Sequence, residues 1–144
     1  MDRDFAQIEA TGPMSAFAYD DTTREIATLT DDEGNTYVRA IDPVMRASRP
    51  FHTEMWYAAH VAGGALTATA TFSGPTISFF LAYADEYAGA TALDQTSTAV
   101  GLTGLVVDSG SRMVTRDGEL IFGHGESFAL NAIGEWIAMM ATFR

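Results

Sequence analysis

The sequence predicts an all-β fold, an antiparallel β-sandwich of the jelly-roll type. Turn-forming pairs such as Gly12-Pro13, Gly63-Gly64, Ser109-Gly110 and Asp117-Gly118 separate short apolar runs, which is the pattern of many short strands. The 144 residues are 47% hydrophobic and 19% charged, a balance typical of one domain with a buried core. Because the chain has no cysteine, packing rather than disulfide bonds must hold this fold.

The first part of the chain is more polar than the rest. We expect residues 1–50 to form an N-terminal arm or accessory strands, and residues 51–144 to form the sandwich domain. A strand is predicted over Glu25–Leu29, with a hairpin partner over Thr36–Ile41. A break is expected at Pro43–Pro50, since proline interrupts strand pairing.

Gly63-Gly64 predicts a hairpin turn between two strands within residues 54–72. The expected pairs are Val61 with Leu66, Ala59 with Ala68, Tyr57 with Ala70, and Met55 with Phe72. The opposite face would carry Glu54, Trp56 and His60 across from threonines. An aromatic ring in that position suits sugar stacking or protein contact, so Trp56 and His60 are candidates for recognition. The alternative is that the N-terminal segment covers Trp56.

The second half of the chain predicts further strands at Thr76–Ala84 and Val100–Val107, with a loop or one helical turn over Asp85–Gln95. A second hairpin is expected to turn at Asp117-Gly118. Its expected pairs are Arg116 with Glu119, Val114 with Ile121, and Met113 with Phe122.

The predicted C-terminal strand, Trp136–Phe143, is apolar on both faces, as is Ile77–Ala84. In a two-layer sandwich only one face of a strand meets the core. The other face, which includes Trp136 and Met140, is therefore a candidate interface with a second copy of the chain. The alternative is a third layer, such as the N-terminal segment folded over the sheet.

Charge and composition exclude several classes of function. Eight arginines and no lysines face 19 acidic residues, so the formal charge of −11 argues against nucleic acid and anionic membranes as partners. No apolar run is long enough to cross a bilayer, and the acidic start has no apolar stretch after it, so no secretory signal is expected.

Catalytic parts are also scarce. The sequence has no thiol or lysine nucleophile, no serine elbow motif and no phosphate-binding glycine motif. His52, His60 and His124 are scattered, and the acidic runs Asp31–Glu33 and Asp85-Glu86 have the composition of solvated turns. We therefore expect no enzyme, no catalytic residue, no cofactor and no metal site.

The last 36 residues, Ser109–Arg144, resemble the closing hairpins of tailed-bacteriophage virion proteins, such as fibre, baseplate and head-decoration domains. The resemblance rests on the Asp-Gly hairpin, the run Gly125–Leu130, the turn at Gly134, and the Trp136-Ile137 pair that opens the last strand. It implies a self-associating structural or attachment protein of the virion, with a trimer favoured, in contact with other virion proteins and assembled in the host cytoplasm.

Two alternatives come from other classes of function. A carbohydrate-binding β-sandwich module would use Trp56 or Tyr57 as its stacking platform for a glycan. A small metal-dependent enzyme on a β-fold would need its histidines to converge in space.

Overall fold

The computed structural model describes residues 7–9, 14–19, 24–45, 51–61, 67–74, 80–85, 87, 92–101, 106–127 and 136–144. In this part of the chain ten strands form three antiparallel sheets, which confirms the all-β prediction. The strands are β1 (Gln7–Glu9), β2 (Met14–Tyr19), β3 (Ile26–Asp31), β4 (Tyr37–Met45), β5 (His52–Ala58), β6 (Thr67–Phe72), β7 (Phe80–Asp85), β8 (Leu93–Gly101), β9 (Leu120–Ser127) and β10 (Trp136–Phe143). The jelly-roll subtype stays a prediction.

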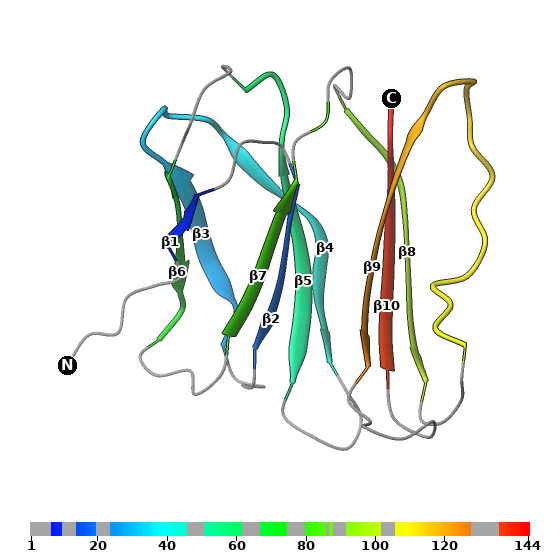
Figure 1. Cartoon of the computed structure of the whole chain (residues 1–144), viewed down its shortest axis with the longest axis horizontal. Coiled ribbons are helices and arrows are strands. Elements are labelled where there is room, and N and C mark those ends of the chain that lie inside the picture. Colours follow the sequence, from blue (N-terminus) through cyan, green and yellow to red (C-terminus); the bar gives the residue numbers. More distant parts are fainter. Residues whose placement is uncertain are drawn as a thin grey trace.

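The three sheets stack in layers, with β4-β5-β2-β7 in the middle, β1-β6-β3 on one side and β8-β10-β9 on the other (Figure 1). Two cores fill the spaces between them. The first core lies between the middle sheet and the sheet of β1, β6 and β3, and its buried residues are Ile26, Leu29, Tyr37, Trp56, Ala58, Ala68 and Ala70. The second core lies between the middle sheet and the sheet of β8, β10 and β9, and its buried residues are Ile41, Phe51, Met55, Phe122, Ile137, Met139, Ala141 and Phe143.

A middle layer explains why some strands are apolar on both faces. In β5, Met55 belongs to the second core while Trp56 and Ala58 belong to the first. In β7, Ala82 packs against the first core, and the ring of Tyr83 lies 5.4 Å from that of His124 in β9. A strand of the middle sheet therefore meets protein on both sides without a second copy of the chain.

The predicted hairpin over residues 54–72 is wrong, because β5 and β6 belong to different sheets. Met55 is paired with Ala16 and Ile41, whereas Ala68 is paired with Ile8 and Asp31. The turn pair Gly63-Gly64 lies outside the described residues. The alternation of polar and apolar residues in β5 was misleading because β5 is buried on both faces. Polar side chains on one face of a buried strand give the same pattern as a face exposed to solvent.

The strands predicted near Glu25–Leu29 and Thr36–Ile41 exist as β3 and β4, but they are not hairpin partners. β3 is paired with β6, and β4 with β5. β4 also continues through Pro43 to Met45, with two register shifts, instead of breaking at the proline. Proline is tolerated here because β4 is an edge strand.

A carboxylate-centred loop carries the chain from β3 to β4. The carboxylate of Asp31 accepts hydrogen bonds from the backbone amides of Glu33 and Asn35, the Asn35 side chain and the Tyr37 hydroxyl. Gly34 has a φ of +76°, a left-handed conformation that suits glycine. The acidic run is thus a structured turn between two layers, as its composition indicated.

In the described residues, strands from the first 50 residues pair with strands from the rest of the chain. β2 and β4, from the first 50 residues, are both paired with β5, and β3 is paired with β6. The N-terminal strands are therefore members of the same sheets as β5 to β7.

The second predicted hairpin is half right. A turn is present at Asp117-Gly118, where Gly118 has a φ of +82°. However, residues 106–119 form no strand, β8 ends at Gly101, and β9 is paired with β10. β8 also begins at Leu93, within the predicted loop.

Candidate functional site

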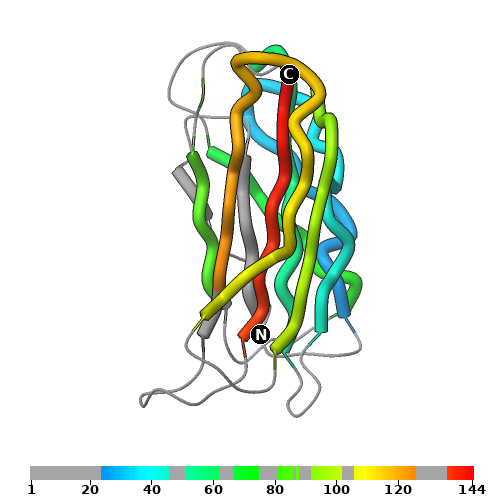
Figure 2. Tube along the Cα trace, turned by 90° about the vertical axis from the view of Figure 1, so that its right-hand side faces the viewer, coloured from blue at the N-terminus to red at the C-terminus, as the bar shows by residue number. Residues whose placement is uncertain are grey.

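Residues 106–119, in the connection between β8 and β9, form a fourth layer on the outside of the sheet (Figure 1). Both strands are antiparallel to β10, so they run parallel to each other. β8 ends opposite Trp136, whereas β9 begins opposite Phe143 at the other end of β10. The chain must return along the whole sheet, and the inner face is already occupied by the second core. We call the described part of this connection, residues 106–119, the strap; Figure 2 shows it crossing the sheet.

Residues with little or no side chain let the strap lie close to the sheet. A Cβ atom on Gly125 in β9 would stand 3.2 Å from Cγ1 of Val107, and a Cβ atom on Gly110 would stand 3.3 Å from Oγ of Ser97 in β8. On the same face, the indole of Trp136 lies directly against Gly101. Larger side chains at Gly101 and Gly125 would therefore displace Trp136 or the strap.

The strap is tied to the edge strand β8 through side chains rather than through a backbone ladder. The hydroxyl of Ser97 donates to the carbonyl of Ser109. The side-chain amide of Gln95 donates to the carbonyl of Met113 over 2.8 Å, and Nε of Arg112 donates to the carbonyl of Thr96 over 3.0 Å. These contacts hold the strap in place while leaving it free of strand pairing.

A carboxylate closes the turn at the end of the strap. Oε1 of Glu119 accepts hydrogen bonds from the backbone amides of Thr115 and Arg116 and from the hydroxyl of Thr115. Desolvation raises the pKa of Glu119, but these bonds and one from Thr142 lower it by more, so the pKa lies below its ordinary value. The hydroxyl of Thr115 also lies 2.9 Å from the Asp94 carboxylate, which joins the turn to β8.

The strap accounts for the second apolar face of β10. On the face opposite the core, Ala138 and Thr142 are only 4% and 1% exposed, and Trp136 and Met140 are half-buried. The additional covering layer that the sequence left open as an alternative is present, but it is built from residues 106–119 and not from the N-terminal segment (Figure 2). The outer face of β10, predicted as the self-association surface, is thus covered within one chain.

Several exposed side chains on and beside the strap are apolar. Val106 is 71% exposed and Met113 is 83% exposed. Together with exposed neighbours they form what we call the strap patch: Val106, Val107, Met113, Val114 and Ile121. Such a group of exposed apolar side chains is characteristic of protein contact surfaces.

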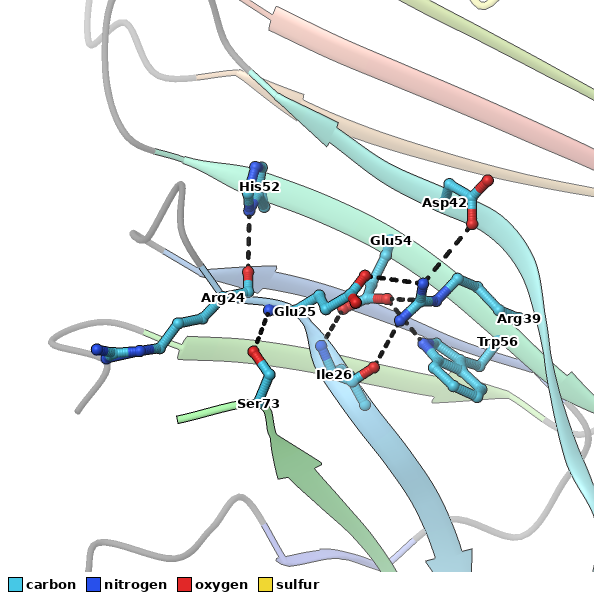
Figure 3. A network of polar contacts seen from close by, with 9 residues as sticks. All are labelled: Arg24, Glu25, Ile26, Arg39, Asp42, His52, Glu54, Trp56 and Ser73. Atoms are coloured by element: carbon cyan, nitrogen blue, oxygen red, sulfur yellow. Dashed lines mark hydrogen bonds and ion pairs between the residues drawn. The ribbon is translucent and has the colours of Figure 1, made fainter. Parts of the chain in front are cut away.

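The other notable cluster is a charged network buried between the middle sheet and the sheet of β1, β6 and β3 (Figure 3). Glu54 is fully buried, and its carboxylate accepts hydrogen bonds from the backbone amide of Ile26 at 2.9 Å and from Nε1 of Trp56 at 3.0 Å. Nε of Arg39 forms an ion pair with it at 3.1 Å. Arg39 also binds the Glu25 carboxylate and the Ile26 carbonyl, and its guanidinium lies 5.0 Å from the centre of the Trp56 ring. These contacts join β3, β4 and β5, so the network has a structural role.

Trp56 is therefore not an exposed recognition residue. Its side chain is only 7% exposed and lies in the first core, where its indole nitrogen is held by Glu54. β3 and β4 cover it, so the alternative of cover by the N-terminal segment describes its position better. Tyr57 is half-buried, and its ring packs 5.3 Å from that of Phe143.

The structure does not bring the remaining candidates together. His60 is exposed just after β5 and has a left-handed φ of 60°, whereas Trp56 is buried. His52 is buried, and its Nδ1 lies 3.3 Å from the carbonyl of Arg24. Within the described ranges, no three histidine, aspartate or glutamate side chains are placed to hold a metal ion.

Sequence reasoning missed the strap. Val106-Val107 was assigned to a strand and Met113-Val114 to a hairpin, although the polar run Asp108–Arg112 between them carries no alternation. That interruption was the one local signal of an unpaired crossover. The covering of β10 depends on the return path of the chain, which no local pattern reveals.

Comparison with known proteins found no match among family models, curated proteins or solved structures. In the residues that the structure describes, no helix is long and apolar enough to cross a membrane.

Proposed function

We propose that this chain is a structural or attachment protein of a phage-like particle, acting through contacts with other protein subunits. The observation that carries the proposal is the strap patch, which holds five of the ten large apolar side chains exposed in the described residues of this acidic chain. The resemblance of Ser109–Arg144 to virion domains suggests the class of particle, and residues 109–119 of the strap lie in that same part of the chain.

The arrangement suits contact better than sugar binding. The carbohydrate alternative depended on Trp56 or Tyr57 as an open platform, and the first is buried while the second packs against Phe143. The trimer expected from the resemblance is not part of the proposal, because its interface was the face of Trp136 and Met140 that lies beneath the strap.

The first test asks whether the chain travels with particles. Particles from the source culture would be banded on a density gradient, and each fraction probed with an antibody against this chain. We expect the chain in the fractions that hold nucleic acid within particles. Finding it only among unassembled proteins would overturn the proposal.

The second test asks whether the strap patch makes the contact. Particles that lack the chain would be mixed with purified protein, and binding would be measured by co-sedimentation. The double variant Met113→Ser and Val114→Ser should bind at least about tenfold more weakly, since losing two apolar anchors costs more than about 1.4 kcal/mol. Val38→Ser is a matched control, because Val38 and Val114 are both 47% exposed and Val38 lies on β4, outside the patch. Equal loss in both variants would refute a role for the strap patch.

A further inference from the structure

The six edges of the three sheets differ in how they are protected. An edge strand offers unpaired N–H and C=O groups to any other strand, so soluble proteins shorten, bulge or cover their edges. β1 has only three residues. β4 contains Pro43 and two register shifts. β3 has a register shift after Ile26, whose amide donates to Glu54 and whose carbonyl accepts from Arg39.

β8 is protected by the strap. Arg112 donates to the carbonyl of Thr96, and Gln95 is held by the carbonyl of Met113. Four of the six edges therefore carry a recognisable device that discourages pairing with another chain.

β9 carries none of these devices in the described residues. It has eight residues, no proline, and an unbroken register with β10 from Leu120 to Ser127. Two glycines, Gly123 and Gly125, alternate along it, and Glu126 is its only formally charged residue. A Cβ atom on Gly123 would meet nothing within 4 Å. A second strand therefore finds a long, flat edge with little side-chain bulk.

The remaining edge strand, β7, shows none of these devices in the described part of the chain either, and it lies on the same side of the stack. β7 pairs with β2 without a register shift, and its Tyr83 ring lies 5.4 Å from the ring of His124 in β9. The open edges of the middle and outer sheets are thus neighbours. A partner on this side would meet two strand edges in adjacent layers.

We propose that the edge of β9 pairs antiparallel with β9 of a second copy of this chain, extending the outer sheet across a two-fold axis. A two-fold axis along the stacking direction turns each strand against its own copy in the antiparallel sense. The same rotation brings β7 to face β7 of the second copy. A second copy is thus the partner whose layers match both open edges at once.

This interface is formed by the edge of β9, which shares only Ile121 with the strap patch on the outer face. Each copy has a net charge of −11, so long-range repulsion opposes the dimer and salt should strengthen it. A cationic foreign partner at the same edge would show the opposite salt dependence.

Light scattering at micromolar concentration tests the stoichiometry. We expect about 31 kDa, twice the chain mass of 15.5 kDa, and a larger dimer fraction when sodium chloride rises from about 20 to about 300 mM. Gly123→Lys places like charges near the axis and should raise the dimer Kd by at least about tenfold, with an unchanged circular dichroism spectrum showing that the fold is intact. The Met113→Ser and Val114→Ser variant should still form the dimer. If the strap patch turns out not to bind particles, the dimer measurement is therefore unaffected. A monomer at every salt concentration, or a trimer, would overturn the β9 interface.

Cross-linking tests the position of the axis. Because the chain has no native cysteine, a single introduced cysteine forms disulfides only between copies. A two-fold axis opposes only one residue of β9 to its own copy, so whichever of Gly123→Cys and Ile121→Cys lies at the axis should give a disulfide-linked dimer under mild oxidation, because opposed residues bring their Cβ atoms within disulfide reach. Thr28→Cys, exposed on the protected strand β3, is the control. Equal cross-linking of Thr28→Cys, or none at either β9 position, would rule out pairing through β9.

Discussion

Replacing Glu54 by alanine tests whether the buried network of Glu54, Arg39 and Trp56 holds the middle sheet against the sheet of β1, β6 and β3. The change removes the acceptor of two hydrogen bonds, from the Ile26 amide and from Nε1 of Trp56, and the ion-pair partner of Arg39. Each buried donor left without an acceptor costs about 1 to 3 kcal/mol. Arg39 keeps its contacts with Glu25 and with the Ile26 carbonyl, which limits the cost of the unpaired cation.

We therefore expect Glu54→Ala to lower the free energy of unfolding by about 3 to 5 kcal/mol, the range for breaking a buried ion pair from one side. For a chain of this length that corresponds to a fall of roughly 8 to 16 °C in the melting temperature. Glu54→Gln keeps one acceptor oxygen and should cost less. Urea unfolding and calorimetry at pH 7 would measure both.

Glu25→Ala is the matched control, because Glu25 contacts the same Arg39 from a side chain that is 51% exposed. An exposed ion pair is worth about 0 to 1 kcal/mol, so this variant should unfold almost as the wild type does. If Glu54→Ala cost less than about 1 kcal/mol, or if Glu25→Ala cost as much, the network would not be what joins the layers.

Two further predictions concern the glycine-lined face and the acidic turns. Gly101→Ala should lower the free energy of unfolding by about 1 to 3 kcal/mol, because the added methyl group collides with Trp136. Gly123→Ala, with open space around the added methyl group, should be neutral or slightly stabilising. Chemical denaturation would measure both variants, and an equal loss of stability would contradict the assignment. Partial burial raises the pKa of Asp31, but its hydrogen bonds lower it by more, and Glu119 behaves in the same way. Since both folded-state pKa values lie below the unfolded ones, their contribution is complete above about pH 5 and is lost as pH falls through the folded values. Melting curves from about pH 2 to 7 should show this acid loss, and it should be smaller in Asp31→Asn, so an unchanged acid slope in that variant would contradict the role of Asp31.

Short-range chemistry made several features predictable from the sequence. The recurrent turn pairs and apolar runs predicted an all-β fold, and the strand Trp136–Phe143 was assigned at its observed bounds. The Asp117-Gly118 turn was also correct, because glycine at a left-handed φ is a local requirement. The apolar character of both faces of β10 correctly indicated that each face is covered.

Tertiary structure decided which surfaces meet. Trp56 and Glu54 seemed to lie on a solvent face because alternation of polar and apolar residues has the same period whether a polar side chain meets water or a buried partner. Arg39 supplies that partner from a different strand, and its pairing with Glu54 is invisible in either local segment.

Strand residues specify that a strand forms, whereas its neighbours depend on the path of the chain between sheets. β5 and β6 therefore separate into different layers, and the connection after β8 must return across the outer face because the inner face is filled. Sequence by itself determined the strands, the turns and the need to cover β10. The three-layer stack, the strap that provides the cover and the position of β9 at the edge of its sheet follow from long-range packing, which no local pattern encodes.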